Sequence, residues 1–405
     1  MPSVFRRLRR TRTHASSSSD GATTPATLAS SPYSSAAASL AATPATSLAS
    51  FAPPTLSQQA YAYLLSAPPY SPLALAAAFE FHFARPSPTS LPSSSVSARA
   101  GAQWHLRSGG EVRPEQREEE HVGDFGCGAA PLAAWLESWA QHVYARDWDA
   151  HMLELAHGTR DMDCEMRASV GLPKGDAAWD IAHGTFAEPN LPRALTFLTL
   201  GSCAHYLAWN EPLATYNVFY RHLLPHGTLL LIGHRPVPGP YDGPCGEQTA
   251  PLRRALEQAP FTEPLARFYG EAARLGHRDM YSTLPTPREA GAAGWLPTVR
   301  YLTVNAPPEW SGPRGEDMTC PEAEELRATS PRAMAHWLRT TTGYVAYLRA
   351  NPQEKARAAV EEDHAGRLMK AACAEGGLDY DDKLELRMFC AALLLRRDAT
   401  SAPVQ

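Results

Sequence analysis

Seven short apolar segments alternate with longer segments over residues 121–397, and this alternation constrains the fold more than any other feature. Such a pattern predicts parallel strands joined by helical crossovers, because parallel neighbours cannot be linked by a tight turn. We therefore expect an α/β protein with a doubly wound, mostly parallel seven-stranded sheet covered by helices on both faces. The strands are predicted near 121–125, 142–147, 179–183, 194–201, 227–233, 298–304 and 385–396.

The stretch "HVGDFGCGAAPLAAW" (121–135) combines the first predicted strand with a glycine-rich turn. Pro131 suits the first position of a helix, which places Gly126 and Gly128 on a strand-to-helix turn where a ligand can approach the backbone. A dinucleotide fingerprint requires a third glycine where Pro131 stands, so the match to it is incomplete. A nucleophilic Cys127 is a second alternative, but a cysteine between glycines is more often a small packing residue.

A third interpretation depends on acidic residues. Asp124 precedes the two glycines, and Asp147 is predicted to end the second strand. In doubly wound folds, an acid at the end of the second strand binds the two hydroxyls of a ribose. The alternative is that Asp147 and Asp149 only cap the helix expected from Ala150, as we expect Asp149 to do.

These segments resemble three motifs of the class I S-adenosylmethionine-dependent methyltransferases. "DFGCGAAP" is similar to their acid-x-Gly-x-Gly-x-Gly motif, with Ala130 replacing the third glycine, and "RHLLPHGTLLLIG" (221–233) is similar to the segment that leads into their fifth strand. "RDWDAHMLELA" is similar to their second motif. The resemblance implies a Rossmann-like methyltransferase fold that binds S-adenosyl-L-methionine through Asp124, Phe125, Gly126, Cys127, Gly128, Asp147, Trp148 and Met152.

Within that family the chain is more similar to the trans-aconitate methyltransferase-like group of fungal type. The resemblance covers residues 57–85 and 121–397 and rests on "APPYSP", "CAHYLAW" and "RTTTGYVAYL". It implies a helical lid before the first motif and places Ala187 and Glu188 near the adenine, although Glu188 fits a surface loop equally well. The chain departs from the group at Ala67, where the lid arginine is missing, and at Thr196, which replaces an acid of the fourth strand.

An activated sulfonium methyl group needs alignment with its acceptor more than it needs special side chains. The acceptor is expected at the carboxyl edge of the sheet, where ligands of open sheets bind. His205 is the candidate general base or substrate contact, and a histidine with a purely structural hydrogen bond is the alternative. Further substrate contacts are predicted at Tyr206, Trp209, Arg235, Trp337 and Arg339. Ser330 and Pro331 should start a helix on which Trp337 shares a face with Met334 and Leu338, and that face is expected to be part of the core.

Composition divides the chain into four parts. Residues 1–53 begin with five arginines and continue as a Ser/Ala/Thr/Pro tract, which predicts a disordered tail. We expect a helical lid segment at 54–85, a linker or insertion at 86–120 and the methyltransferase domain at 121–397. The arginine-rich start also fits a mitochondrial targeting segment, the alternative to a cytoplasmic location.

Charge and cysteine content limit the partners. A net charge of −5 without a basic aromatic surface argues against nucleic acid, and no apolar run is long enough for a membrane. Seven widely spaced cysteines without a CxxC pair argue for free thiols, and we expect no metal. The predicted function is methyl transfer to a small molecule, such as a carboxylic acid, by a monomer or homodimer. The alternative is a degenerate member of the fold that binds a partner without catalysis.

Overall fold

The computed structural model describes residues 70–83, 120–169, 177–239, 243–307, 310, 312, 316–317 and 327–399. The predicted tail, most of the predicted lid and nearly all of the predicted insertion lie outside the described residues. Within the described part of the chain, no helix is both long and apolar enough to cross a membrane.

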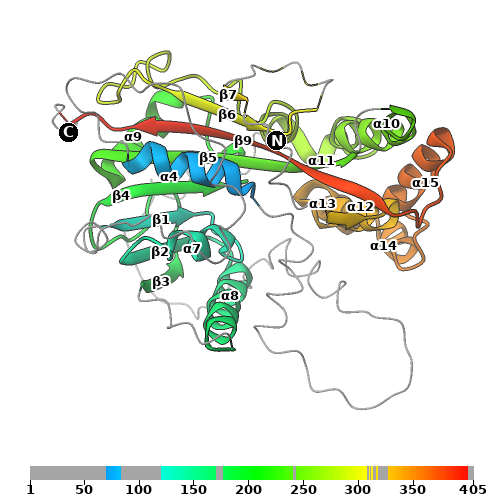
Figure 1. The fold of residues 1–405 in the computed structure, drawn as a ribbon, viewed down its shortest axis with the longest axis horizontal. Helices are drawn as coiled ribbons and strands as arrows, with labels where there is room; N and C mark the ends of the chain where they lie inside the picture. The colour runs from blue at the N-terminus through cyan, green and yellow to red at the C-terminus, as the bar shows by residue number, and fades with distance from the viewer. Residues whose placement is uncertain are drawn as a thin grey trace, which may run out of the picture.

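One twisted sheet organises the fold (Figure 1). Its strand order is β3-β2-β1-β4-β5-β9-β6-β7, and β8 pairs with β9. The first five strands in this order are parallel, whereas β9 runs antiparallel to both β5 and β6. The strands are β1 (His121–Phe125), β2 (His142–Asp147), β3 (Ala178–His183), β4 (Leu195–Gly201), β5 (Leu223–Gly239), β6 (Arg300–Val304), β7 (Glu316–Asp317), β8 (Arg327–Thr329) and β9 (Leu384–Arg396).

This arrangement is the predicted doubly wound, mostly parallel sheet. The seven predicted strands correspond to β1 to β6 and β9, and the two short strands β7 and β8 were not predicted. The chain builds β1, β2 and β3 on one side and then returns to place β4 on the other side of β1. The strand order therefore reverses between β1 and β4, and such a switch point opens a crevice at the carboxyl ends of the strands.

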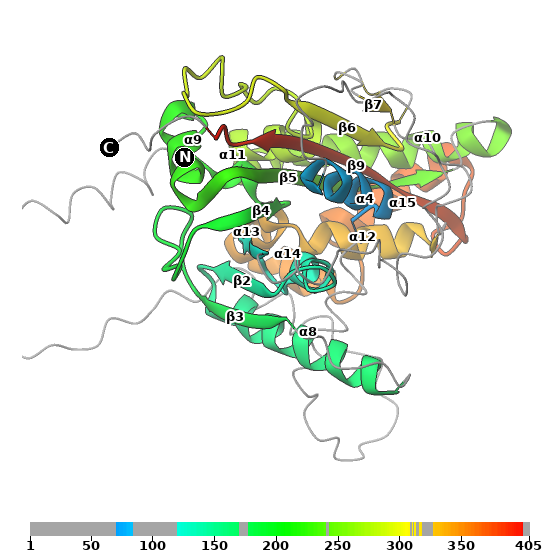
Figure 2. The same cartoon turned by 60° about the vertical axis from the view of Figure 1, so that its left-hand side comes forward.

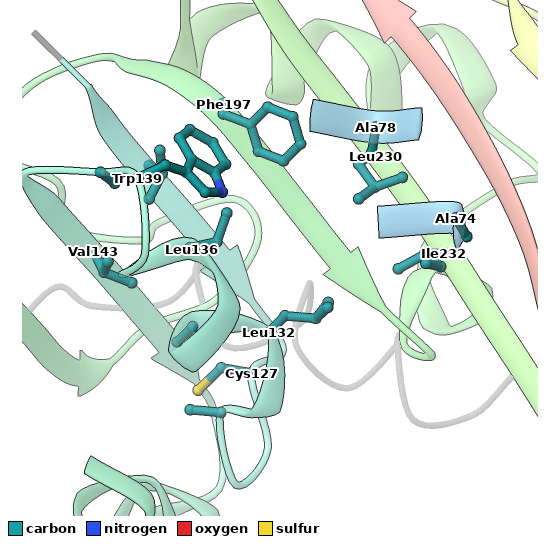
Figure 3. Close-up of a cluster of buried hydrophobic side chains, with 14 of the residues drawn as sticks. Ala74, Ala78, Cys127, Leu132, Leu136, Trp139, Val143, Phe197, Leu230 and Ile232 are labelled. Carbon is teal, nitrogen blue, oxygen red and sulfur yellow. The ribbon is translucent and has the colours of Figure 1, made fainter. Parts of the chain in front are cut away.

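Helices cover both faces of the sheet. On one face, α4 (Pro72–Phe83) lies across β5 and β9 (Figures 1 and 2), and α7 (Pro131–Leu136) packs beside it together with α8 (Ala150–Ser169). Figure 3 shows the core of this face, where Ala74 and Ala78 of α4 approach Leu230 and Ile232 of β5. On the other face, α9 (Pro212–His222) contributes buried aromatic side chains that pack on β4 and β5.

A group of helices packs around its own core beside the carboxyl end of β5 and the amino end of β9 (Figure 1). Its members are α10 (Gly243–Gln258), α11 (Ala266–Ala273), α12 (Pro331–Thr340), α13 (Thr342–Ala350), α14 (Pro352–Ala358) and α15 (His364–Gly376). The predicted start of α12 is confirmed, because Ser330 Oγ accepts the Ala333 amide hydrogen at 3.2 Å and Pro331 occupies the first turn. The helical group buries Met334, Leu338 and part of Trp337, as their shared helix face predicted.

Candidate functional site at the carboxyl edge of the sheet

The glycine turn after β1 is held against the end of β2. Gly126 and Gly128 have φ values of 67° and 55°, which favour glycine. The amides of Gly126 and Cys127 both donate to the Arg146 carbonyl, at 2.7 and 3.1 Å. The Gly128 amide donates to Asp147 Oδ2 at 2.8 Å. The predicted strand-to-helix turn is therefore confirmed, and its backbone is fixed by the neighbouring strand.

Asp147 ends β2, as predicted, and its carboxylate accepts two backbone hydrogens. Besides Gly128, the Asp149 amide donates to Asp147 Oδ1 at 2.9 Å. Burial raises the pKa of Asp147, and the two amide hydrogens act in the opposite direction. Asp149 caps α8 by accepting the His151 amide hydrogen at 2.9 Å, which confirms its predicted role. Each carboxylate oxygen can accept two hydrogen bonds, so Asp147 keeps acceptor capacity for a diol.

Asp124 lies in β1 at the switch point and is 1% exposed. Its Oδ1 accepts a hydrogen bond of 2.9 Å from Thr199 of β4, while Oδ2 is buried without a hydrogen-bond partner among the described residues. Burial raises the pKa of Asp124 to about 7, against the opposing effect of Thr199 and of the Ala133 amide. The carboxyl group is thus held against β4 at the switch point, in a buried site that disfavours its charge.

The other residues expected around the cofactor divide into buried and exposed members. Met152 packs with Ala129 in a small buried cluster, while Trp148 beside Asp147 is 55% exposed. Ala187 and Glu188 lie on an exposed loop after β3. Trp148 therefore presents an exposed, flat aromatic surface beside the Asp147 carboxylate.

Arg146 fixes the loop that carries Ala187 and Glu188, and the sequence alone did not indicate this role. Its buried guanidinium donates to the Pro189 carbonyl at 2.7 Å and to Asp180 Oδ2 at 2.7 Å. The residue sits inside an apolar strand, directly before Asp147, where an arginine is rarely buried without partners. An arginine at this position of an apolar strand could have indicated the buried role from the sequence.

Cys127 is a packing residue in this structure. Its side chain is 5% exposed, and burial raises the pKa of its thiol well above the usual value. A thiol that resists ionisation is a poor nucleophile, which argues against the catalytic alternative. The described free cysteines are Cys127, Cys203, Cys373 and Cys390.

Ala130 adopts the conformation that a glycine would favour. It caps α7 with φ 60° and ψ 41°, and it is fully buried. Left-handed backbone is unfavourable for an alanine by about 1–2 kcal/mol. Ala130, which stands where the motif that the sequence resembles has its third glycine, therefore carries backbone strain.

His205 follows β4 in a short helix, η2 (Ala204–Tyr206), and is buried. Its Nδ1 lies 3.3 Å from the Tyr281 hydroxyl, and its ring contacts that of Tyr206. Tyr206 is 42% exposed, and Trp209 donates its indole hydrogen to the Ala204 carbonyl. These residues form one aromatic group after β4, which is compatible with both the functional and the structural interpretation of His205.

Arg235 and Trp337 do not belong to this aromatic group. They line a cavity of about 20 Å³ below α10, which has room for about one water molecule. Arg235 is paired with Glu257 at 3.2 Å. Neither His205 nor Tyr206 lines this cavity, so the predicted substrate residues do not share one pocket.

Arg339 is engaged inside the helical group. Its guanidinium donates to both carboxylate oxygens of the buried Asp363, at 2.9 and 2.6 Å. Asp363 also accepts the Tyr344 hydroxyl hydrogen and caps α15. This is the geometry of a structural ion pair, and the predicted substrate contact at Arg339 would have to compete with it.

Three polar residues that the sequence did not single out meet beside the switch point. The Tyr70 hydroxyl donates to Ser202 Oγ at 3.4 Å, and Ser202 Oγ lies 3.4 Å from His234 Nδ1. Tyr70 belongs to the "APPYSP" segment, whereas Ser202 directly follows β4 and His234 lies within β5. Among the described residues, no group of three or more His, Cys, Asp or Glu side chains is placed to hold a metal ion.

Comparison with known proteins finds similarity in structure alone. No family profile and no curated protein matches the chain. Similar solved structures include a candidate type II methyltransferase from Anaeromyxobacter dehalogenans, with 14% identity over 68% of this chain and 88% of that one at a TM-score of 0.40. The YcgJ protein of Bacillus subtilis has 14% identity over 69% and 93% of the two chains at a TM-score of 0.34.

A third similar structure is the mycolic acid cyclopropane synthase CmaA1 in complex with SAH and CTAB. It has 14% identity over 69% of this chain and 79% of that one, at a TM-score of 0.32. None of these three likenesses reaches a TM-score of 0.5, so none carries an argument about what this chain binds. The sheet order and the site geometry must carry it.

Proposed function

We propose that this protein transfers a methyl group from S-adenosyl-L-methionine to a small molecule. The observation that carries the proposal is the hydrogen bond between the Gly128 amide and Asp147, which joins a glycine turn after β1 to an acid at the end of β2. These two features stand at adjacent carboxyl ends beside a topological switch point, where a nucleoside is bound in doubly wound folds. The exposed Trp148 next to Asp147 supports an adenosine ligand.

The cofactor's chemistry sets modest demands on the protein. When bound, S-adenosylmethionine supplies an electrophilic methyl group. Asp147 would hold the ribose, and the loop fixed by Arg146 would border the base. The chain's own contribution is to orient the acceptor and exclude water, which can supply a large part of the rate enhancement.

The class of the methyl acceptor follows from the groups that could bind it. The family resemblance suggests a carboxylic acid, and arginine is the side chain that best binds a carboxylate. Arg235, the arginine expected for this purpose, is paired with Glu257, and Arg339, the other arginine among the predicted substrate contacts, is paired with Asp363. The groups beside β4 and β5 therefore give a better indication of the acceptor.

Calorimetry with S-adenosylhomocysteine tests the proposal. We expect a Kd in the micromolar range, about 8 kcal/mol. Asp147→Ala should weaken binding by roughly 2 kcal/mol or more, because a hydrogen bond to a charged group contributes about 1.5–3 kcal/mol. Asp147 also holds the Gly128 amide, so a second variant is needed that leaves the turn intact.

Trp148→Ala supplies that variant, because the side chain is 55% exposed. It should weaken binding without changing the melting temperature. Val360→Ala, at a remote site that is 68% exposed, is the matched control and should change neither. Absence of binding at millimolar ligand would contradict the proposal and favour the degenerate alternative. The strained Ala130 would then be the first position to restore to glycine.

A further inference from the structure

A hydrogen-bonded chain of Tyr70, Ser202 and His234 lies beside the carboxyl end of β4 and the middle of β5. Tyr70 lies two residues before α4, Ser202 directly follows β4, and His234 lies in β5 two residues beyond Ile232. Alternate residues of a strand share a face, so His234 points to the α4 side of the sheet, as Ile232 does in Figure 3. The Tyr70 and His234 rings meet edge to face, with centroids 4.5 Å apart.

Gly201 leaves the space that the Tyr70 hydroxyl occupies. A Cβ atom at this position would fall within van der Waals contact of Tyr70 Oη and 2.5 Å from Leu132 Cδ1. Leu132 belongs to α7, which begins directly after the glycine turn. Tyr70 therefore lies against the carboxyl end of β4 and against α7, next to the turn that we propose to bind the cofactor.

Ser202 is held in an uncommon conformation. Its φ is 52°, and its amide donates to the Ile232 carbonyl at 2.7 Å. Non-glycine residues in this region of conformational space are enriched at functional sites, where the surrounding structure imposes the strain. Here the strain turns the Ser202 hydroxyl toward both Tyr70 and His234.

We propose that this chain is a proton relay, and that the methyl acceptor is a hydroxyl group. This inference rests on the proposed methyl transfer. The acceptor oxygen forms a bond to the methyl carbon as the methyl–sulfur bond breaks. The acceptor proton passes to Tyr70 Oη, the Tyr70 proton to Ser202 Oγ, and the Ser202 proton to His234 Nδ1. The positive charge of the sulfonium thereby becomes that of an imidazolium, and the product is a methyl ether.

Tyr70 is the group that touches the acceptor, whereas Ser202 and His234 act through it. Burial raises the pKa of Tyr70 well above the usual value, so the phenol stays protonated and must pass its own proton onward. A carboxylate acceptor carries no proton and would not need a relay. A relay at this edge, with both candidate arginines engaged elsewhere, therefore favours a hydroxyl over a carboxylic acid.

The nature of the labelled product tests the acceptor class. Methyl-labelled S-adenosylmethionine is incubated with the protein and an extract of small acids and phenols. Mild base releases volatile methanol from a methyl ester, but it leaves a methyl ether intact, and a cation exchanger at low pH retains an N-methyl amine. We expect base-stable label that the exchanger does not retain.

Three variants test the relay in the same assay. Tyr70→Phe, Ser202→Ala and His234→Gln should each lower kcat by about 10²-fold, as expected for loss of general base catalysis. Serial dilution of the extract gives a relative KM, and we expect this value and the Kd for S-adenosylhomocysteine to change less than about threefold. Tyr380→Phe is the control, since it removes a phenol hydroxyl in the helical group and should leave turnover unchanged.

The outcomes separate this inference from the proposed function. Base-labile label, or label retained as an amine, overturns the hydroxyl acceptor while methyl transfer stands. Wild-type kcat in Tyr70→Phe overturns the relay, and Ser202→Ala decides the question if Tyr70→Phe fails to fold. Absence of cofactor binding in the wild-type protein overturns the proposed function and this inference together.

Discussion

The raised pKa of the buried Asp124 predicts a measurable dependence of folding stability on pH. Its carboxyl group is buried, and burial raises its pKa from 3.8 to about 7. In the unfolded chain the group ionises near pH 4, whereas in the folded protein it keeps its proton up to about pH 7. The folded state therefore binds more protons between these values, and stability must fall as pH rises through this window.

The size of the effect follows from the shift. A change of about three pKa units corresponds to about 4 kcal/mol, because each unit is worth about 1.36 kcal/mol. Asp124→Asn keeps the shape of the side chain and can still accept the Thr199 hydroxyl hydrogen, but it does not titrate. The variant should lose this part of the pH dependence.

Urea unfolding of both proteins from pH 4 to pH 8 measures the effect. The difference in unfolding free energy, wild type minus Asp124→Asn, should fall by up to about 4 kcal/mol between pH 4 and pH 7 and then stay level. The subtraction removes groups common to both proteins, including His121, whose pKa burial lowers to about 4. A constant difference across the range would refute a strongly raised pKa for Asp124.

Two further predictions concern the glycine turn and the ion pair of the helical group. Gly126→Ala should lower the free energy of unfolding by about 1–3 kcal/mol more than Gly128→Ala does, as measured in urea. The reason is that a Cβ at Gly126 would lie 2.7 Å from Cys203 Sγ, whereas nothing lies within 4 Å of a Cβ at Gly128. Equal losses of stability would contradict this prediction. Arg339→Ala should destabilise the fold by about 3–5 kcal/mol by leaving the buried Asp363 without its cation, with no change in cofactor Kd. Reduced turnover at unchanged stability would instead support the predicted substrate contact.

The strand predicted from the sequence is shorter than the observed β5, and the difference has a physical reason. The predicted strand covered 227–233, but β5 extends to Gly239 through "HRPVPG", whose two prolines suggested a loop. In the described sheet, residues after Ile232 pair with β9 and not with β4. Pro236 and Pro238 therefore lie on an edge strand, where a missing backbone hydrogen is tolerated. Only the length of the neighbouring β4 reveals this.

Sequence distance explains which parts of the candidate site could be predicted. Asp147 and Gly128 are only 19 residues apart. Asp147 ends β2 and Gly128 lies on the turn after β1, and strands connected by a single helix, as β1 and β2 are, usually lie side by side. Tyr70 and Ser202 are 132 residues apart. Ser202 follows β4 and His234 lies in β5, and no single sequence motif contains both residues. Their meeting depends on where α4 crosses the sheet, and the sequence pattern of α4 cannot specify this because its apolar residues are not confined to one face. Local motifs therefore indicate the nucleotide half of such a site, while the acceptor half is set by tertiary packing.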